Sequence, residues 1–74
     1  MTAEGLARYE GALARLSPSD REVIIGRFEL GFTFPELAVA LAKPTADAAR
    51  MAVDRALPKL IQFLVDSHPD SPRA

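Results

Sequence analysis

Apolar residues recur at helical spacing in four stretches of this chain, and helix-capping residues separate the stretches. In the first, Leu6, Tyr9, Leu13 and Leu16 lie three or four residues apart with small alanines between them. This spacing places the apolar side chains on one face of an amphipathic helix. The pattern therefore predicts a first helix at about residues 3–15.

A second helix is expected at about residues 18–30. Ser17 can cap its first turn, Pro18 suits the first helical position, and Asp20 favours the positive end of the helix. Gly31 stands where a left-handed residue would end it. The apolar stripe expected to be buried comprises Val23, Ile24, Ile25, Phe28 and Leu30.

The third and fourth helices are expected at about residues 34–42 and 46–66. Thr33 and Glu36 have the spacing of a capping box, Lys43-Pro44 closes the third helix, and Thr45 begins the fourth. Pro58 interrupts the last pattern, so we expect a kink or a break near Leu57. The apolar face of the fourth helix comprises Ala49, Val53, Ala56, Leu57, Leu60, Ile61, Leu64 and Val65.

Four helices without any strand-period segment predict an all-α fold, a small four-helix domain over residues 1–67 with a flexible tail at 68–74. The third helix, the short link after it and the fourth helix have the order of a helix-turn-helix. The core is predicted to include the phenylalanines Phe28, Phe32, Phe34 and Phe63.

Composition narrows the possible chemistry. The 74 residues contain no cysteine and one histidine, His68, which lies beside the predicted tail. We therefore expect no metal site, no cofactor and no thiol nucleophile. Asp20 and Glu36 are explained as capping acids, so we do not expect an enzyme. Without a signal-like start or a long apolar run, the protein is expected to be cytoplasmic and to have no membrane partner.

Charge is distributed unevenly along the chain. The net charge of −1 argues against a protein that coats nucleic acid without specificity. Residues 43–59 carry four basic side chains against two acidic ones and form the only net-positive stretch. This stretch coincides with the start of the fourth helix, where a helix-turn-helix protein reads DNA.

The order of residues across about positions 6–65 resembles region 4 of bacterial extracytoplasmic-function sigma factors. That region has a leucine-rich lead, an acid-arginine-acid helix, a glycine, an acid-aliphatic-alanine helix and an arginine-alanine pair in its recognition helix. The matching positions are Leu13, Leu16, Asp20, Arg21, Glu22, Ile24, Ile25, Arg27, Gly31, Phe34, Glu36, Leu37, Ala38, Leu41, Arg50, Arg55, Ala56, Leu57 and Leu60.

The resemblance implies sequence-specific binding to the upstream (minus-thirty-five) promoter element, as part of a sigma factor that directs RNA polymerase in transcription initiation. The implied partners are promoter DNA and the flap of the polymerase beta subunit, with an anti-sigma factor able to cover the same faces. The apolar run at residues 60–65 is the expected polymerase-facing surface.

In this interpretation the helix after Thr45 enters the major groove. Arg50 is the expected reader of guanine, Arg55 contacts a base or a phosphate, and Met51 contacts a thymine methyl group. Lys43 and Lys59 bind phosphates, and free N–H groups at the start of the third helix bind another. The candidate DNA-contacting residues are Thr33, Phe34, Lys43, Thr45, Ala46, Asp47, Arg50, Met51, Asp54, Arg55 and Lys59.

Three alternatives remain open from the sequence. Arg50 has the spacing to form ordinary ion pairs with Asp47 or Asp54, and Asp54 would repel phosphate, which predicts weak intrinsic DNA affinity. The chain also shares features with quorum-response-type helix-turn-helix transcription regulators, namely the lead at residues 16–18 and the helix at 36–38. The third alternative is a sigma-like protein-interaction module without DNA binding.

Overall fold

A computed structural model describes residues 2–66, and every regular element in that range is helical. The elements are α1 (Ala3–Arg15), α2 (Pro18–Ile24), a π-helical turn η1 (Ile25–Glu29), α3 (Phe34–Ala40) and α4 (Ala46–Asp66). The predicted all-α, four-helix fold is confirmed. The predicted end of the domain at residue 67 and the tail at 68–74 lie outside the described residues.

The helices begin at the predicted capping residues. Ser17 Oγ accepts the backbone N–H of Asp20 at 3.2 Å. In α3, Thr33 Oγ1 accepts the N–H of Glu36 at 3.3 Å, and the Glu36 carboxylate accepts the N–H of Thr33 at 2.8 Å. These bonds satisfy donors that the first helical turn leaves without a partner. Short-range chemistry therefore determines where α2 and α3 start.

The segment formed by α2 and η1, and helix α3, are each followed by a residue with positive φ. Gly31 has a φ of 72° and ends the segment after η1, as the sequence predicted. Ala42 has a φ of 55°, and the N–H of Lys43 donates to the Ala38 carbonyl at 2.8 Å. This closing turn ends α3 at Ala40, two residues before the predicted end. The connection to α4 is consequently tight and well defined.

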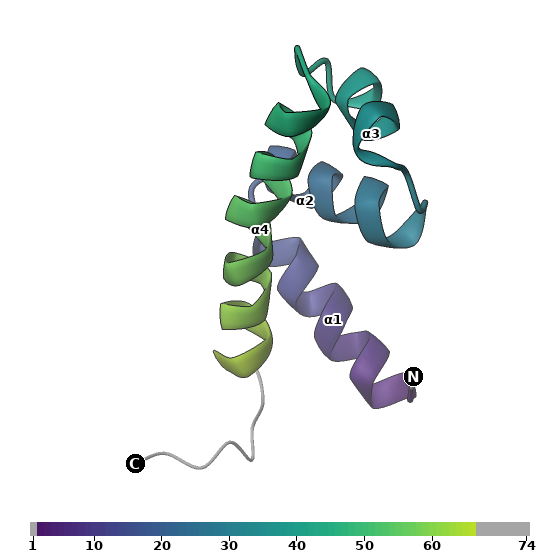
Figure 1. Ribbon diagram of the computed structural model, residues 1–74. Coiled ribbons are helices and arrows are strands. Elements are labelled where there is room, and N and C mark those ends of the chain that lie inside the picture. The colour runs from purple at the N-terminus through teal and green to yellow at the C-terminus, as the bar shows by residue number, and fades with distance from the viewer. Residues whose placement is uncertain (1, 67–74) are drawn as a thin grey trace.

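α4 forms the long axis of the molecule, with α2 and α3 beside its N-terminal half, while α1 diverges from its C-terminal half (Figure 1). α4 contacts each of the other three helices. Ile24 and Leu37 are the largest side chains that are fully buried. The buried core comprises Ala12, Leu13, Leu16, Val23, Ile24, Leu37, Ala38, Ala49, Ala52, Val53, Ala56 and Leu60.

α4 does not break at Pro58, so the expectation of a break is wrong, whereas the alternative of a kink is not decided by the helix bounds. The helix is continuous from Ala46 to Asp66 with Pro58 inside it. Proline removes one backbone hydrogen bond, but Ala56 and Leu60 on either side of it are buried in the core. Core contacts on both sides of Pro58 thus accompany the continuous helix. Ile61 and Val65, which were expected on the buried face, are exposed, because α1 diverges from this end of α4 (Figure 1).

The end of the second helical segment differs from the prediction. Phe28 and Leu30 were expected in the buried stripe, yet they are 53% and 62% exposed. Between residues 25 and 29 the chain widens into a π turn, in which the Leu30 N–H donates to the Ile25 carbonyl at 3.0 Å. A π turn inserts residues relative to α-helical spacing. The side chains that follow Ile25 are therefore rotated away from the positions that the α-helical period predicts.

Arg21 joins α2 to the end of α1. Its guanidinium donates to the carbonyl oxygens of Leu13 and Ala14 at 3.2 Å and of Leu16 at 3.0 Å. Arg21→Ala leaves these carbonyls without that donor and should lower the free energy of unfolding by about 1–3 kcal/mol. Urea denaturation measures the change. Arg8→Ala, which removes a peripheral cation, is the control and should change stability by less than about 0.5 kcal/mol. Equal effects of the two variants would contradict the role of Arg21 in joining α2 to α1.

Candidate nucleic-acid interface

The N-terminal half of α4 presents most of the predicted DNA-contacting side chains to solvent. Ala46 is partly buried, whereas the longer side chains on this helix are accessible. The core-facing positions Ala49, Ala52 and Val53 alternate with them along the helix. The exposed candidates on α4 are Asp47, Arg50, Met51, Asp54, Arg55 and Lys59.

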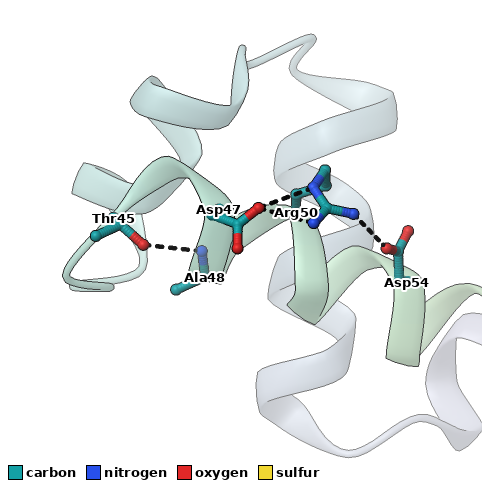
Figure 2. A network of polar contacts seen from close by, with 5 residues as sticks. All are labelled: Thr45, Asp47, Ala48, Arg50 and Asp54. Carbon is teal, nitrogen blue, oxygen red and sulfur yellow. Dashed lines mark hydrogen bonds and ion pairs between the residues drawn. The ribbon is translucent and has the colours of Figure 1, made fainter.

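Arg50 lies between two carboxylates of its own helix (Figure 2). Its Nη2 and Nε donate to Asp47 Oδ1 at 2.7 and 3.1 Å, and its Nη1 donates to Asp54 Oδ2 at 3.0 Å. The hydrogen bond and charge of Asp47, followed by the charge of Asp54, raise the pKa of Arg50. Of the two sequence interpretations of Arg50, the ion-paired one describes the arrangement without DNA.

The Arg50 ion pairs are weak enough to be exchanged. All three side chains are about half exposed or more, and pairs of this spacing on a helix surface contribute only about 0.2–0.5 kcal/mol each. A base edge or a phosphate can therefore replace either aspartate at small cost. The three residues together nevertheless carry one net negative charge, which opposes the approach of DNA until such an exchange takes place.

The predicted residues that flank the two helix starts have structural partners. Thr45 Oγ1 accepts the N–H of Ala48 at 3.0 Å and caps α4 (Figure 2). The capping box of α3 uses both Thr33 groups, and the backbone hydrogen bond from Thr33 lowers the pKa of Glu36. The N–H groups of Thr33 and Glu36 are therefore already used within the capping box, and the phosphate contact expected at this helix start stays a prediction.

Phe34 has a packing role. The guanidinium of Arg27 lies over its ring at 4.2 Å from the centroid. The same guanidinium donates to the Phe32 carbonyl at 2.7 Å, so Arg27 links η1 to the start of α3. Phe34 is partly buried against the core. Its expected place in the core is thus partly realised, and its ring is occupied on one face by a cation of the same chain.

Lys59 forms an ion pair that the sequence did not predict. Its Nζ lies 3.0 Å from Asp20 Oδ2 across the contact between α4 and α2. Asp20 is the less exposed partner, at 19% for its side chain. The two positions are 39 residues apart, and only the packing of α2 against α4 joins them. Part of the positive charge counted for residues 43–59 is therefore used inside the fold.

Lys43 and Arg55 face one open pocket of about 270 Å³ between α2, the α3–α4 turn and α4. Neither side chain forms a hydrogen bond or ion pair within residues 2–66. The pocket wall also carries Ser19, Asp20 and Glu22, and Asp20 is neutralised by its ion pair. The two cations available to an outside phosphate thus lie together, an arrangement the sequence did not show.

Arg50 and Arg55 lie on different sides of α4. Residues five apart on an α-helix point about 140° away from each other, since each residue turns the helix by about 100°. In agreement with this, Arg50 contacts Asp47 and Asp54, whereas Arg55 lines the pocket beside α2. The two arginines therefore face different surroundings, and the contact of Arg55 with a base or a phosphate stays a prediction.

Two other kinds of site are missing from the part of the chain that the structure describes. No group of three or more His, Cys, Asp or Glu side chains in residues 2–66 is arranged to hold a metal ion. No helix in the same range is long and apolar enough to cross a membrane. In comparisons with protein-family models, with curated proteins and with solved structures, this chain matches none of them.

Proposed function

We propose that this chain binds promoter DNA through the N-terminal half of α4, as the region 4 part of a sigma factor. The target is the upstream (minus-thirty-five) promoter element, and binding directs RNA polymerase in transcription initiation. The observation that carries the proposal is the exposed charged face of α4 directly after the short helix α3 and its tight turn. The residue order of region 4 across most of the chain supports it.

Binding begins with an exchange at Arg50. The major groove accepts an α-helix, and a guanidinium that donates two hydrogen bonds to guanine contributes about 1–3 kcal/mol of discrimination. Arg50 leaves one of its aspartates to make this contact, and Met51 beside it is exposed for contact with a thymine methyl group. Lys43 and Arg55 hold a backbone phosphate at their shared pocket.

The affinity of the isolated chain for DNA is low in this proposal. Asp47 and Asp54 are both exposed next to Arg50, so they repel phosphates close to the reading surface. Attachment to RNA polymerase raises the effective concentration of the domain at the promoter and compensates for weak contacts. Ile61 and Val65, exposed near the end of α4, provide an apolar surface for the beta flap or for an anti-sigma factor.

A protein-interaction module without DNA binding is the second candidate, favoured by the pairing of Arg50 with two carboxylates. Fluorescence anisotropy with promoter DNA separates the candidates, using the chain alone and fused to RNA polymerase. Sequence-specific binding that falls with rising salt supports the DNA-binding function. Arg50→Ala should weaken selection of the matching promoter about tenfold or more in the fused protein. Unchanged promoter selection in that variant would refute the reading role of Arg50.

Asp54→Asn should raise the affinity for DNA about three- to tenfold at low salt, because it removes a negative charge from the reading face and leaves Arg50 freer to exchange partners. The measurement is anisotropy with the same promoter DNA. Asp66→Asn, which makes the same change of charge at the far end of α4, is the matched control. If both variants raise affinity equally, net charge alone is responsible; a decrease for Asp54→Asn would mean that this carboxylate positions Arg50.

A further inference from the structure

A second hollow surface lies between α1 and η1, away from the candidate DNA interface. It is an open groove of about 510 Å³ lined by Leu6, Tyr9, Glu10, Phe28 and Glu29. Leu6 and Phe28 are both exposed although they are large and apolar. Exposed apolar side chains gathered in one concave place indicate an interaction surface more strongly than the same side chains scattered over a protein.

The π turn places Phe28 in this groove. An α-helical continuation of α2 predicts Phe28 in the core, whereas the wide turn at η1 leaves it facing solvent beside α1. The turn packs closely against the core, since a Cβ on Gly26 would lie 2.7 Å from Cδ1 of Leu37, a fully buried side chain. π turns inside helices occur frequently at functional sites. The exposure of Phe28 is thus built into the fold.

The groove is acidic. Glu10 and Glu29 line it together with the apolar side chains, and none of its lining residues is basic. The Tyr9 hydroxyl donates to Glu29 Oε2 at 2.7 Å and so holds this carboxylate at the groove. Burial and the hydrogen bond to Glu29 raise the pKa of Tyr9 to about 12, in agreement with the hydroxyl acting as the donor. The groove therefore combines the apolar side chains of Leu6 and Phe28 with the carboxylates of Glu10 and Glu29.

We propose that this groove binds a basic amphipathic helix of a partner protein, whose apolar residues contact Leu6 and Phe28 and whose lysines or arginines pair with Glu10 and Glu29. Charge excludes nucleic acid as the occupant, because the carboxylates repel phosphates. It also disfavours a second copy of the chain. A symmetric dimer brings the same patch against itself, so Glu10 and Glu29 would face the same glutamates. A basic amphipathic helix complements both the apolar side chains and the carboxylates of the groove.

The test uses the full 74-residue chain and two designed helical peptides, one with leucine and phenylalanine on one face flanked by lysines, the other with glutamates in place of the lysines. Titration followed by nuclear magnetic resonance and calorimetry should show that the lysine peptide binds about tenfold more tightly or better. The shifts should centre on Leu6, Tyr9 and Phe28. Equal binding of both peptides, no binding of the lysine peptide, or shifts centred on α4 would each overturn the proposal.

Variants of the groove residues test the separate roles of the carboxylates and of Phe28 in peptide binding. The pair Glu10→Gln with Glu29→Gln keeps the side-chain shapes and should weaken the lysine peptide about three- to tenfold, and Phe28→Ser should weaken both peptides. Val39→Ser, which removes an exposed apolar side chain of α3, is the control and should leave binding unchanged. A dimer in sedimentation that Phe28→Ser dissolves would identify a second copy as the occupant and refute the basic partner.

Binding of a basic helix at the groove is independent of promoter binding, and the two can be tested separately. The groove is lined by residues of α1 and η1, whereas the candidate DNA contacts lie on α4 and the α3–α4 turn. Phe28→Ser is expected to leave DNA affinity unchanged. A chain that binds the lysine peptide but no promoter DNA would reject the proposed function alone, and the reverse result would reject the groove alone.

Discussion

Replacing both Lys43 and Arg55 by alanine is expected to lower affinity for promoter DNA by about ten- to a hundredfold at low salt. These side chains face the same pocket and form no ion pair within the described residues, so an incoming phosphate displaces no partner of theirs. Each phosphate contact also steepens the salt dependence of binding. The slope of log affinity against log salt should therefore become shallower by about 2 in the double variant. Anisotropy titrations over a range of salt concentrations measure both effects.

The matched control for this pair removes two cations elsewhere. Arg8→Ala with Arg15→Ala lowers the net charge by the same amount on α1, where Arg8 pairs with Glu4 and Arg15 lies over the Phe63 ring. This control should reduce DNA affinity less than about threefold and leave the salt slope nearly unchanged. If the control weakens binding as much as the Lys43 and Arg55 variant, the phosphate contact does not lie at the pocket.

Leu37→Ala is expected to destabilise the domain by about 2–5 kcal/mol. Leu37 is fully buried in α3 and approaches Gly26 of η1 closely, so its loss leaves a cavity where α3 packs on the rest of the core. Small domains have stabilities of about 5 kcal/mol, so this variant should keep about 0–3 kcal/mol and be up to about half unfolded at room temperature. Circular dichroism during urea denaturation measures the loss of stability. The loss of this packing would also free the turn between α3 and α4.

Val39→Ala is the control for this substitution within the same helix. Val39 is 83% exposed, so its truncation should change the free energy of unfolding by less than about 0.5 kcal/mol. A loss of similar size in both variants would show that the burial of Leu37 does not explain its effect, since alanine favours the helix more than valine does and cannot weaken α3 through propensity. Full stability of Leu37→Ala would contradict the position of α3 against η1.

Most of the fold was predictable because its signals are local. The caps at Ser17 and Thr33 and the stop at Gly31 are each read from a few neighbouring residues, and each one forms as expected. Buried positions with regular spacing were also predictable in α4, where Ala49, Val53 and Ala56 recur on the core face. Such features depend on helix geometry alone and need no knowledge of the partner surface.

The candidate site was predictable only in part. Helical spacing places Arg50 near Asp47 and Asp54. The sequence was therefore compatible both with ion pairing of Arg50 and with contact to a base. The meeting of Lys43 with Arg55 and the ion pair between Lys59 and Asp20 depend on how α2 lies against α4. No periodic signal within one helix reports which residues face each other across two helices.

By itself, the sequence determined the number of helices, the capping residues Ser17, Thr33 and Thr45, and the exposed charged face of α4, because these follow from contacts within about one helical turn. Only the tertiary structure decided which cations of that face are available, whether Pro58 breaks α4, and where Phe28 points. Packing settles these because burial of Ala56 and Leu60 outweighs one lost backbone hydrogen bond, and the close contact of Gly26 with Leu37 accompanies a wider helical turn at η1. Long-range burial thus overrules local spacing at these positions.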